Sequence, residues 1–182
     1  MSDHIPGATG ASVTADADES LLEVQQYLTF QLGSEVFAIG ILRIKEILEY
    51  SAVTTVPMMP ACILGVINLR GAVVPVLDLA TRFRRQRSEA TRRTATVIVE
   101  TEAQGQVQVV GVIVDAVNEV LEIPPADIEP APSFGTRVRA DFIQGMGKVD
   151  GKFVIILDTD RILAAEDLAG TLLDAPALLQ PA

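Results

Sequence analysis

The sequence predicts an all-β protein with short helices, built from two similar small β-barrels packed on each other. Three observations predict it. Apolar and polar residues alternate over several short segments, as in half-buried strands. Glycine and proline (13 and 10 residues) separate these segments at short intervals. A pattern of glycines also recurs, since Gly145 and Gly151 stand 80 residues after Gly65 and Gly71.

Composition excludes several classes of function. The 182 residues suit one domain or two small ones, and 49% hydrophobic residues can bury a sizeable core. A net charge of −10 argues against nucleic-acid binding as the main activity. Neither a span for membrane insertion nor a signal peptide is expected. The single Cys62 and single His4 argue against a disulfide, a metal site and a Cys–His nucleophile, so no metal or other cofactor is expected.

The elements follow in order along the chain. Residues 1–24 predict a disordered tail, because small and polar residues dominate without a sustained period. Strands are expected at 25–32, 36–39, 54–56, 66–69, 72–77, 96–100, 107–114, 119–123 and 153–157. A helical turn is expected between residues 41 and 48. Asp78 and Asp158 are each placed to cap a short helix, the second of which begins a C-terminal helix and tail at 158–182.

The repeat suggests how the chain divides. We expect a first barrel at about 33–83 and a second at about 94–157, with strand 25–32 as a segment that both could share. Each half alone, at roughly 70 residues, would bury a marginal core. The two barrels are therefore expected to pack on each other along one apolar seam.

The two copies differ at one turn. The second hairpin turns at Asp150-Gly151, a favoured pair because both residues tolerate positive φ. The first turns at Arg70-Gly71, where arginine has no turn propensity to justify it. Such a broken local rule often marks function, although an ordinary solvated arginine remains the alternative. Pro75 within a strand pattern predicts an edge strand or a bulge.

The segment between the barrels is rich in arginine. Residues 82–93 contain six of the fourteen basic residues and only one acidic residue, Glu89. A solvated loop is the favoured interpretation, and a site for phosphate or an acidic partner is the alternative. An enzyme using Asp115, Glu119 or Glu46 is a further alternative, but these carboxylates lack a partnered nucleophile or a metal-ligand set.

The stretch 65–71 reads Gly-Val-Ile-Asn-Leu-Arg-Gly and is followed by Val-Pro-Val-Leu-Asp-Leu at 74–79. This resembles the signature of the CheW family of chemotaxis coupling proteins, which is homologous to the regulatory domain of the histidine kinase CheA. The resemblance covers about residues 25–168. It implies two SH3-like five-stranded barrels and no catalysis.

The resemblance also implies partners. The family couples chemoreceptors, the methyl-accepting chemotaxis proteins, to CheA, and the implied location is the cytoplasm, at receptor arrays on the inner membrane. An adaptor of the same fold in a non-flagellar or non-chemotaxis kinase pathway is the alternative. Phe134 is the implied kinase-binding residue. The residues implied for the receptor-binding groove are Ile44, Glu46, Gly65, Arg70, Val73 and Val120.

Overall fold

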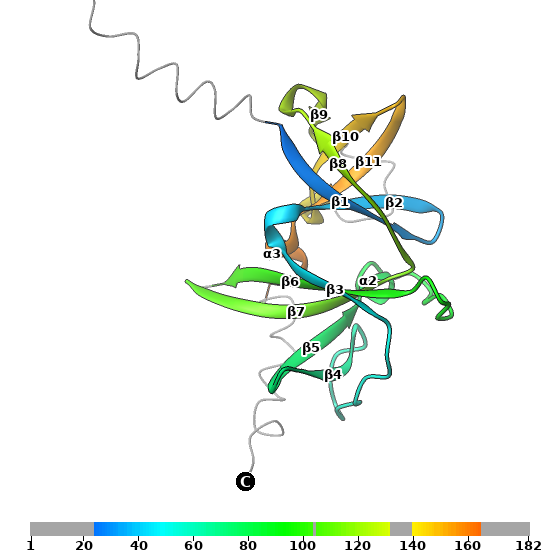
Figure 1. Cartoon of the computed structure of the whole chain (residues 1–182), viewed down its shortest axis with the longest axis vertical. Coiled ribbons are helices and arrows are strands. Elements are labelled where there is room, and N and C mark those ends of the chain that lie inside the picture. Colours follow the sequence, from blue (N-terminus) through cyan, green and yellow to red (C-terminus); the bar gives the residue numbers. More distant parts are fainter. Residues whose placement is uncertain (1–23, 104, 132–139, 165–182) are drawn as a thin grey trace, which may run out of the picture.

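The computed structural model describes residues 24–103, 105–131 and 140–164, which fold into two sheets (Figure 1). The strands are β1 (Gln25–Leu32), β2 (Glu35–Gly40), β3 (Ile44–Glu49), β4 (Ile63–Leu69), β5 (Ala72–Asp78), β6 (Ala95–Ala103), β7 (Gln106–Val114), β8 (Ala116–Ile123), β9 (Ile128–Glu129), β10 (Ile143–Val149) and β11 (Lys152–Leu157). The helices are short: η1 (Ile41–Arg43), α2 (Leu79–Arg82), η2 (Pro125–Asp127), η3 (Ala140–Phe142) and α3 (Thr159–Ile162). No helix in the described ranges is long and apolar enough to cross a membrane.

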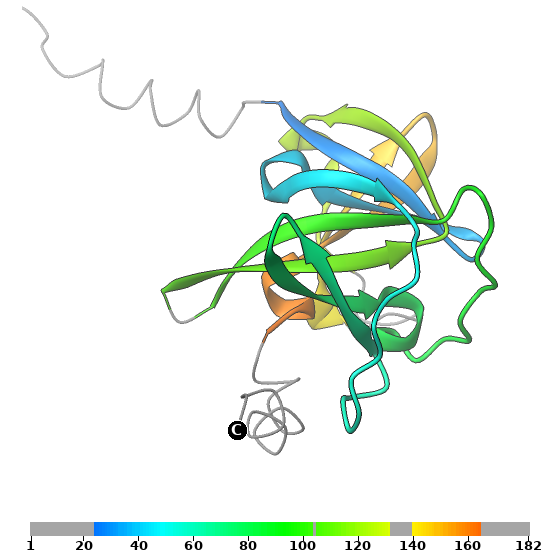
Figure 2. The same ribbon diagram turned by 60° about the horizontal axis from the view of Figure 1, so that its bottom comes forward.

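The two sheets form two barrels, and the fold class predicted from the sequence is confirmed. Barrel 1 has the strand order β3-β6-β7-β5-β4. Barrel 2 has the order β8-β1-β2-β11-β10-β9. The two lie one above the other in Figure 1, and Figure 2 shows the same stack turned by 60°.

The expected division into contiguous halves, 33–83 and 94–157, is wrong. The hairpin β1–β2 pairs with β8 and β11 in barrel 2, whereas the hairpin β6–β7 pairs with β3 and β5 in barrel 1. Each copy of the repeat therefore lends its first hairpin to the other copy's barrel. A repeat offset shows which segments are equivalent, but it carries no information about which copy a strand pairs with.

Both barrels close in the same way. The segment after β3 crosses to the free side of β4, where Thr54 and Val66 exchange two backbone hydrogen bonds of 2.9 Å. In barrel 2 the segment after β8 continues into β9, which pairs with β10. The strand expected at 54–56 is thus reduced to a single bridge at Thr54.

One apolar core joins the barrels. Phe30, Phe37, Phe83 and Phe142 form a chain of rings with successive centroids 5.6–6.1 Å apart. Phe83 follows α2 of barrel 1 and the other three belong to barrel 2, so the rings cross the seam. Buried residues of β6 and β7 complete the same cluster from barrel 1. A smaller cluster around Tyr27, Ala38 and Ile156 fills the inside of barrel 2.

Some local expectations are confirmed and others are corrected. The side chains of Asp78 and Asp158 cap α2 and α3 by accepting backbone N–H bonds of 3.2 Å. The helical turn expected over 41–48 is confined to η1, and β3 follows it. Strand β5 is interior, so the edge strand expected from Pro75 is wrong, but the register between β4 and β5 does shift between Ile63 and Gly65, next to the pair Val66–Pro75.

The sheet tolerates Pro75 for a local reason. Its partner in the register, Val66, directs both backbone groups to Thr54 on the far side. Pairing of β5 with β7 begins only at Val76. No ladder bond needs the missing N–H of the proline. The expectations for residues 1–23 and for the C-terminal segment beyond residue 164 lie outside the described residues.

Candidate docking site at the β4–β5 hairpin

The Arg70-Gly71 turn adopts the backbone that the repeat predicted. Arg70 has φ of 53° and Gly71 of 88°, close to the 51° and 77° of Asp150 and Gly151. Positive φ at both central residues is the type I′ hairpin turn. The N–H of Gly71 donates to the side-chain oxygen of Asn68 at 2.8 Å, which fixes the turn. Arginine thus stands in a left-handed conformation that favours Asn, Asp or Gly.

Arg70 forms a bidentate ion pair with Glu46 of β3. Its two terminal nitrogens donate to the two carboxylate oxygens at 3.1 and 2.9 Å. Strands β3 and β4 are opposite edges of the sheet, so this pair joins the two ends of barrel 1. The side chain of Arg70 remains 78% exposed, against 23% for Glu46. One face of the guanidinium is therefore still available to a partner.

A backbone bulge in β3 places neighbouring side chains on opposite faces of the sheet. Ile44 stands opposite Val99 and Ile47 opposite Val97, both of which belong to the shared core. Glu46 stands opposite Ile98 instead, because the register shifts between Ile44 and Glu46. Ile44 and Ile47 thus border the seam between the barrels, and Glu46 points to the other face, toward Arg70.

Exposed apolar side chains accompany the pair. Val73 lies on the same hairpin as Arg70 and is 72% exposed, while Ile47 is 45% exposed. Val120 is 47% exposed on β8 of barrel 2, opposite the core residue Leu28. It therefore borders the seam from the other barrel, and no hydrogen bond or ion pair between described residues joins it to Arg70. Ile47 was not predicted as a site residue, because the sequence pattern indicated a helical turn over 41–48 and not the bulged strand β3.

Gly65 has a different role from its neighbours. It is buried, its φ is 156°, and a Cβ there would lie 2.1 Å from the backbone oxygen of Thr54. The segment that closes barrel 1 passes directly over this position. Gly65 thus supports the site by allowing closure and offers no side chain to a partner. Phe134 lies outside the described residues.

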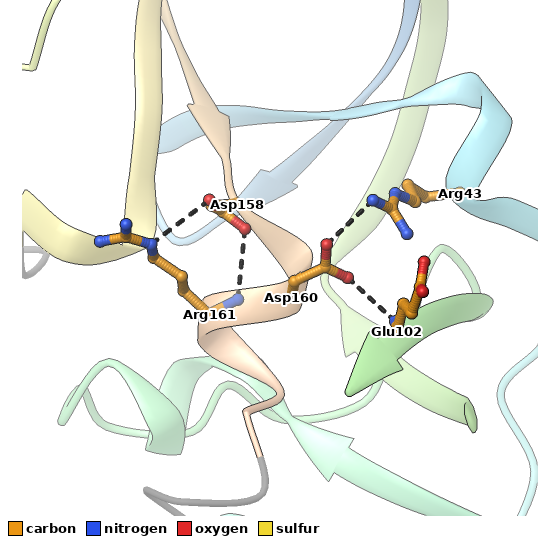
Figure 3. Close-up of polar contacts among 5 residues, drawn as sticks. All are labelled: Arg43, Glu102, Asp158, Asp160 and Arg161. Atoms are coloured by element: carbon orange, nitrogen blue, oxygen red, sulfur yellow. Dashed lines mark hydrogen bonds and ion pairs between the residues drawn. The ribbon is translucent and has the colours of Figure 1, made fainter. Parts of the chain in front are cut away.

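A polar bridge holds the barrels together on another side, as Figure 3 shows. Asp160 of α3 accepts from Arg43 at 2.9 Å and from the backbone N–H of Glu102 at 3.2 Å. Arg43 lies in the link between β2 and β3, and Glu102 lies in the β6–β7 hairpin. Asp160 thus ties barrel 2 to the hairpin of barrel 1 and to the link between the barrels.

Two of the three candidate catalytic carboxylates, Asp115 and Glu46, have structural roles, whereas Glu119 is exposed and bonds to Thr29 through its backbone. Asp115 accepts from the backbone N–H of Gly33 at 2.7 Å and from the hydroxyl of Ser88 at 3.1 Å. Glu46 is paired with Arg70. Burial raises the pKa of the Cys62 thiol, which disfavours the reactive thiolate. Within the described ranges no group of three or more His, Cys, Asp or Glu side chains could hold a metal ion.

Comparison with known proteins shows the family to which this chain belongs. The model of the CheW-like domain matches residues 26–167. The chain belongs to the CheW-like domain family. It is 35% identical over 145 residues to a chemotaxis protein CheW of Klebsiella aerogenes, covering 80% of this chain and 85% of the relative.

Two further relatives agree. A chemotaxis protein CheW of Rhizobium meliloti is 32% identical over 143 residues, covering 79% of this chain and 90% of the relative. The crystal structure of the scaffolding protein TtCheW from Thermoanaerobacter tengcongensis superposes with a TM-score of 0.70 at 33% identity. That comparison covers 78% of this chain and 94% of the solved one.

Proposed function

We propose that this CheW-like protein is a non-catalytic adaptor that couples chemoreceptors to the histidine kinase CheA in chemotaxis. Membership of the family and a scaffolding relative support the coupling role. The receptor tip would dock at the Arg70 hairpin and the seam, and the regulatory domain of CheA would dock at another face. We further propose that the protein acts in the cytoplasm and is recruited to receptor arrays at the membrane.

The observation that carries the receptor site is the pair between Arg70 and Glu46. An arginine held in a left-handed turn, bidentate to one carboxylate and still 78% exposed, presents a fixed guanidinium on the same hairpin as the exposed Val73. A guanidinium fixed in this way can accept a second polar partner at little cost in side-chain entropy. The exposed Val73 and Ile47 would supply apolar contact area for a helical hairpin.

The test distinguishes direct contact of Arg70 with the receptor from a role of Arg70 in stabilising barrel 1. Arg70→Glu places two carboxylates together, and it should abolish capture of the protein by a receptor fragment. The double variant Arg70→Glu/Glu46→Arg restores an ion pair with reversed polarity. If Arg70 contacts the receptor, the double variant regains stability but not receptor capture. Full recovery of capture would show that the pair only stabilises barrel 1.

A matched control uses the internal repeat. Lys152→Glu introduces a similar charge change in the equivalent hairpin of barrel 2, where the side chain is exposed. It should leave receptor capture unchanged. In a reconstitution with kinase and receptor, receptor control of kinase autophosphorylation should require the wild-type chain. Control that is equally strong without the chain would end the proposal.

A further inference from the structure

The arginine-rich connector between α2 and β6, residues 84–94, is a fixed strap rather than a free loop. It is the green segment that leaves α2 in Figures 1 and 2. Ser88 bonds to Asp115, and Arg87 donates to the hydroxyl of Tyr50 at 3.1 Å. The backbone N–H of Thr91 donates to the side chain of Thr94 at 2.8 Å, which closes a turn before β6. These bonds attach the strap to barrel 1 and to the link between β7 and β8.

The arginines of this region fall into two groups. Arg82 donates to the carbonyl of Ile162 at 3.0 Å, and its guanidinium lies 4.6 Å from the ring centroid of Phe142. Arg85 pairs with Glu35 at 2.9 Å and lies over Phe37, with only 19% of its side chain exposed. Both therefore hold the seam together. The expectation of a wholly solvated loop is wrong for these two residues.

The second group faces solvent. Arg84, Arg87, Arg92 and Arg93 are exposed, and none forms an ion pair with a carboxylate in the part of the chain that the structure describes. The acidic groups near the strap are few. Glu35 is paired with Arg85, Asp115 accepts two hydrogen bonds, and Glu49 and Glu89 are exposed.

This strap stands out against the charge of the whole molecule. The chain carries a net charge of −10, yet four guanidinium groups that have no carboxylate partner among the described residues gather within ten positions. An anion approaching elsewhere is repelled, and the field at the strap attracts it. Because the strap is already anchored, docking a ligand there costs little ordering of the loop.

We propose that the strap is a further docking surface, which binds an acidic peptide segment of a partner protein. Guanidinium groups match carboxylates in bidentate geometry. A nucleic acid fits less well, because residues 84–94 present no aromatic ring on which a base could stack. A membrane also fits less well, since the strap has no large apolar side chain to insert. The surface lies apart from the Arg70 hairpin. It would help proteins of this fold to select among their binding partners.

The test uses the full chain and a fluorescein-labelled hexaglutamate peptide, with binding followed by fluorescence anisotropy. Wild type should bind at about 50 mM salt and lose most of this affinity at about 300 mM, because exposed charge pairs are screened. The triple variant Arg84→Gln/Arg92→Gln/Arg93→Gln should bind about tenfold more weakly, as each exposed pair contributes a few-fold. Backbone amide shifts in labelled wild type should change in the strap, which checks the site without a variant.

The control variant is Lys148→Gln/Lys152→Gln/Arg161→Gln. It removes the same charge from exposed positions of barrel 2 and should keep the wild-type affinity. Equal losses in both variants would show that only net charge matters and would overturn the proposal. Tighter binding of single-stranded DNA or of phosphatidylglycerol vesicles than of the peptide would also overturn it. So would a several-fold gain in peptide affinity on deletion of residues 1–23, since the acidic start of this chain would then occupy the strap.

Discussion

Replacement of Gly65 by alanine tests how barrel 1 closes. A Cβ at this position would lie 2.1 Å from the oxygen and 2.7 Å from the carbon of the Thr54 carbonyl. Both atoms belong to the backbone, so no rotamer change can relieve the contact. The closing segment must move away, and its two hydrogen bonds with Val66 are lost.

The magnitude follows from two costs. Two backbone hydrogen bonds contribute about 1 kcal/mol each. Forcing a non-glycine residue into a conformation of φ 156° costs about 1–3 kcal/mol more. The free energy of unfolding should therefore fall by about 3–5 kcal/mol, measured as a lower midpoint of urea denaturation with an unchanged slope.

Gly33→Ala is the matched control. Its φ is 63°, but nothing lies within 4 Å of the new Cβ. It should cost only about 1–2 kcal/mol of left-handed strain. Alanine restricts the unfolded chain equally in both variants, so the difference between them isolates the contact with Thr54. Equal destabilisation by the two substitutions would refute the closure argument.

Three further predictions use other parts of the structure. Asp78→Ala should lower the free energy of unfolding by about 1–3 kcal/mol, because the capping carboxylate is buried. Asp158→Ala removes a half-buried cap and should cost less in the same denaturation assay. Asp160→Ala should lower the free energy of unfolding by less than about 2 kcal/mol. It should speed hydrogen exchange of the Glu102 backbone amide, because this N–H loses its acceptor. Unchanged exchange at Glu102 would contradict the bridge. Cys62, whose thiol pKa is raised by burial, should resist alkylation by iodoacetamide at neutral pH and react as pH rises or urea unfolds the protein; rapid native labelling at pH 7 would contradict its burial.

Much of the fold could be predicted from local rules. Asp78 and Asp158 cap short helices, and the turn at Arg70 adopts positive φ, because caps and turns depend on a few neighbouring residues. The exchange of hairpins between barrels could not be predicted. In either pairing β6 would place its valines against an apolar partner, so the hydrophobic pattern is the same for both arrangements.

The site was predictable in part. The repeat marked Arg70 as anomalous, and the family resemblance pointed to Glu46, but nothing in the spacing showed that these two side chains pair across the open edges of a sheet. Gly65 was expected to contribute to a groove, whereas its contact with Thr54 makes it a closure residue. Contacts of this kind depend on the three-dimensional path of the chain.

The exchange of hairpins bears directly on how an adaptor could hold two docking faces in a fixed relation. Strand β2 of barrel 2 reaches β3 of barrel 1 through the three residues of η1, and β7 of barrel 1 reaches β8 of barrel 2 through Asp115 alone. Each barrel is therefore completed by a hairpin that is covalently held close to the other barrel. Rotation of one barrel against the other would strain both short links and open the shared core around Phe37 and Phe83. Two barrels made from contiguous halves would share only the long connector, whose length would permit such rotation, so the exchanged arrangement gives the stiffer scaffold.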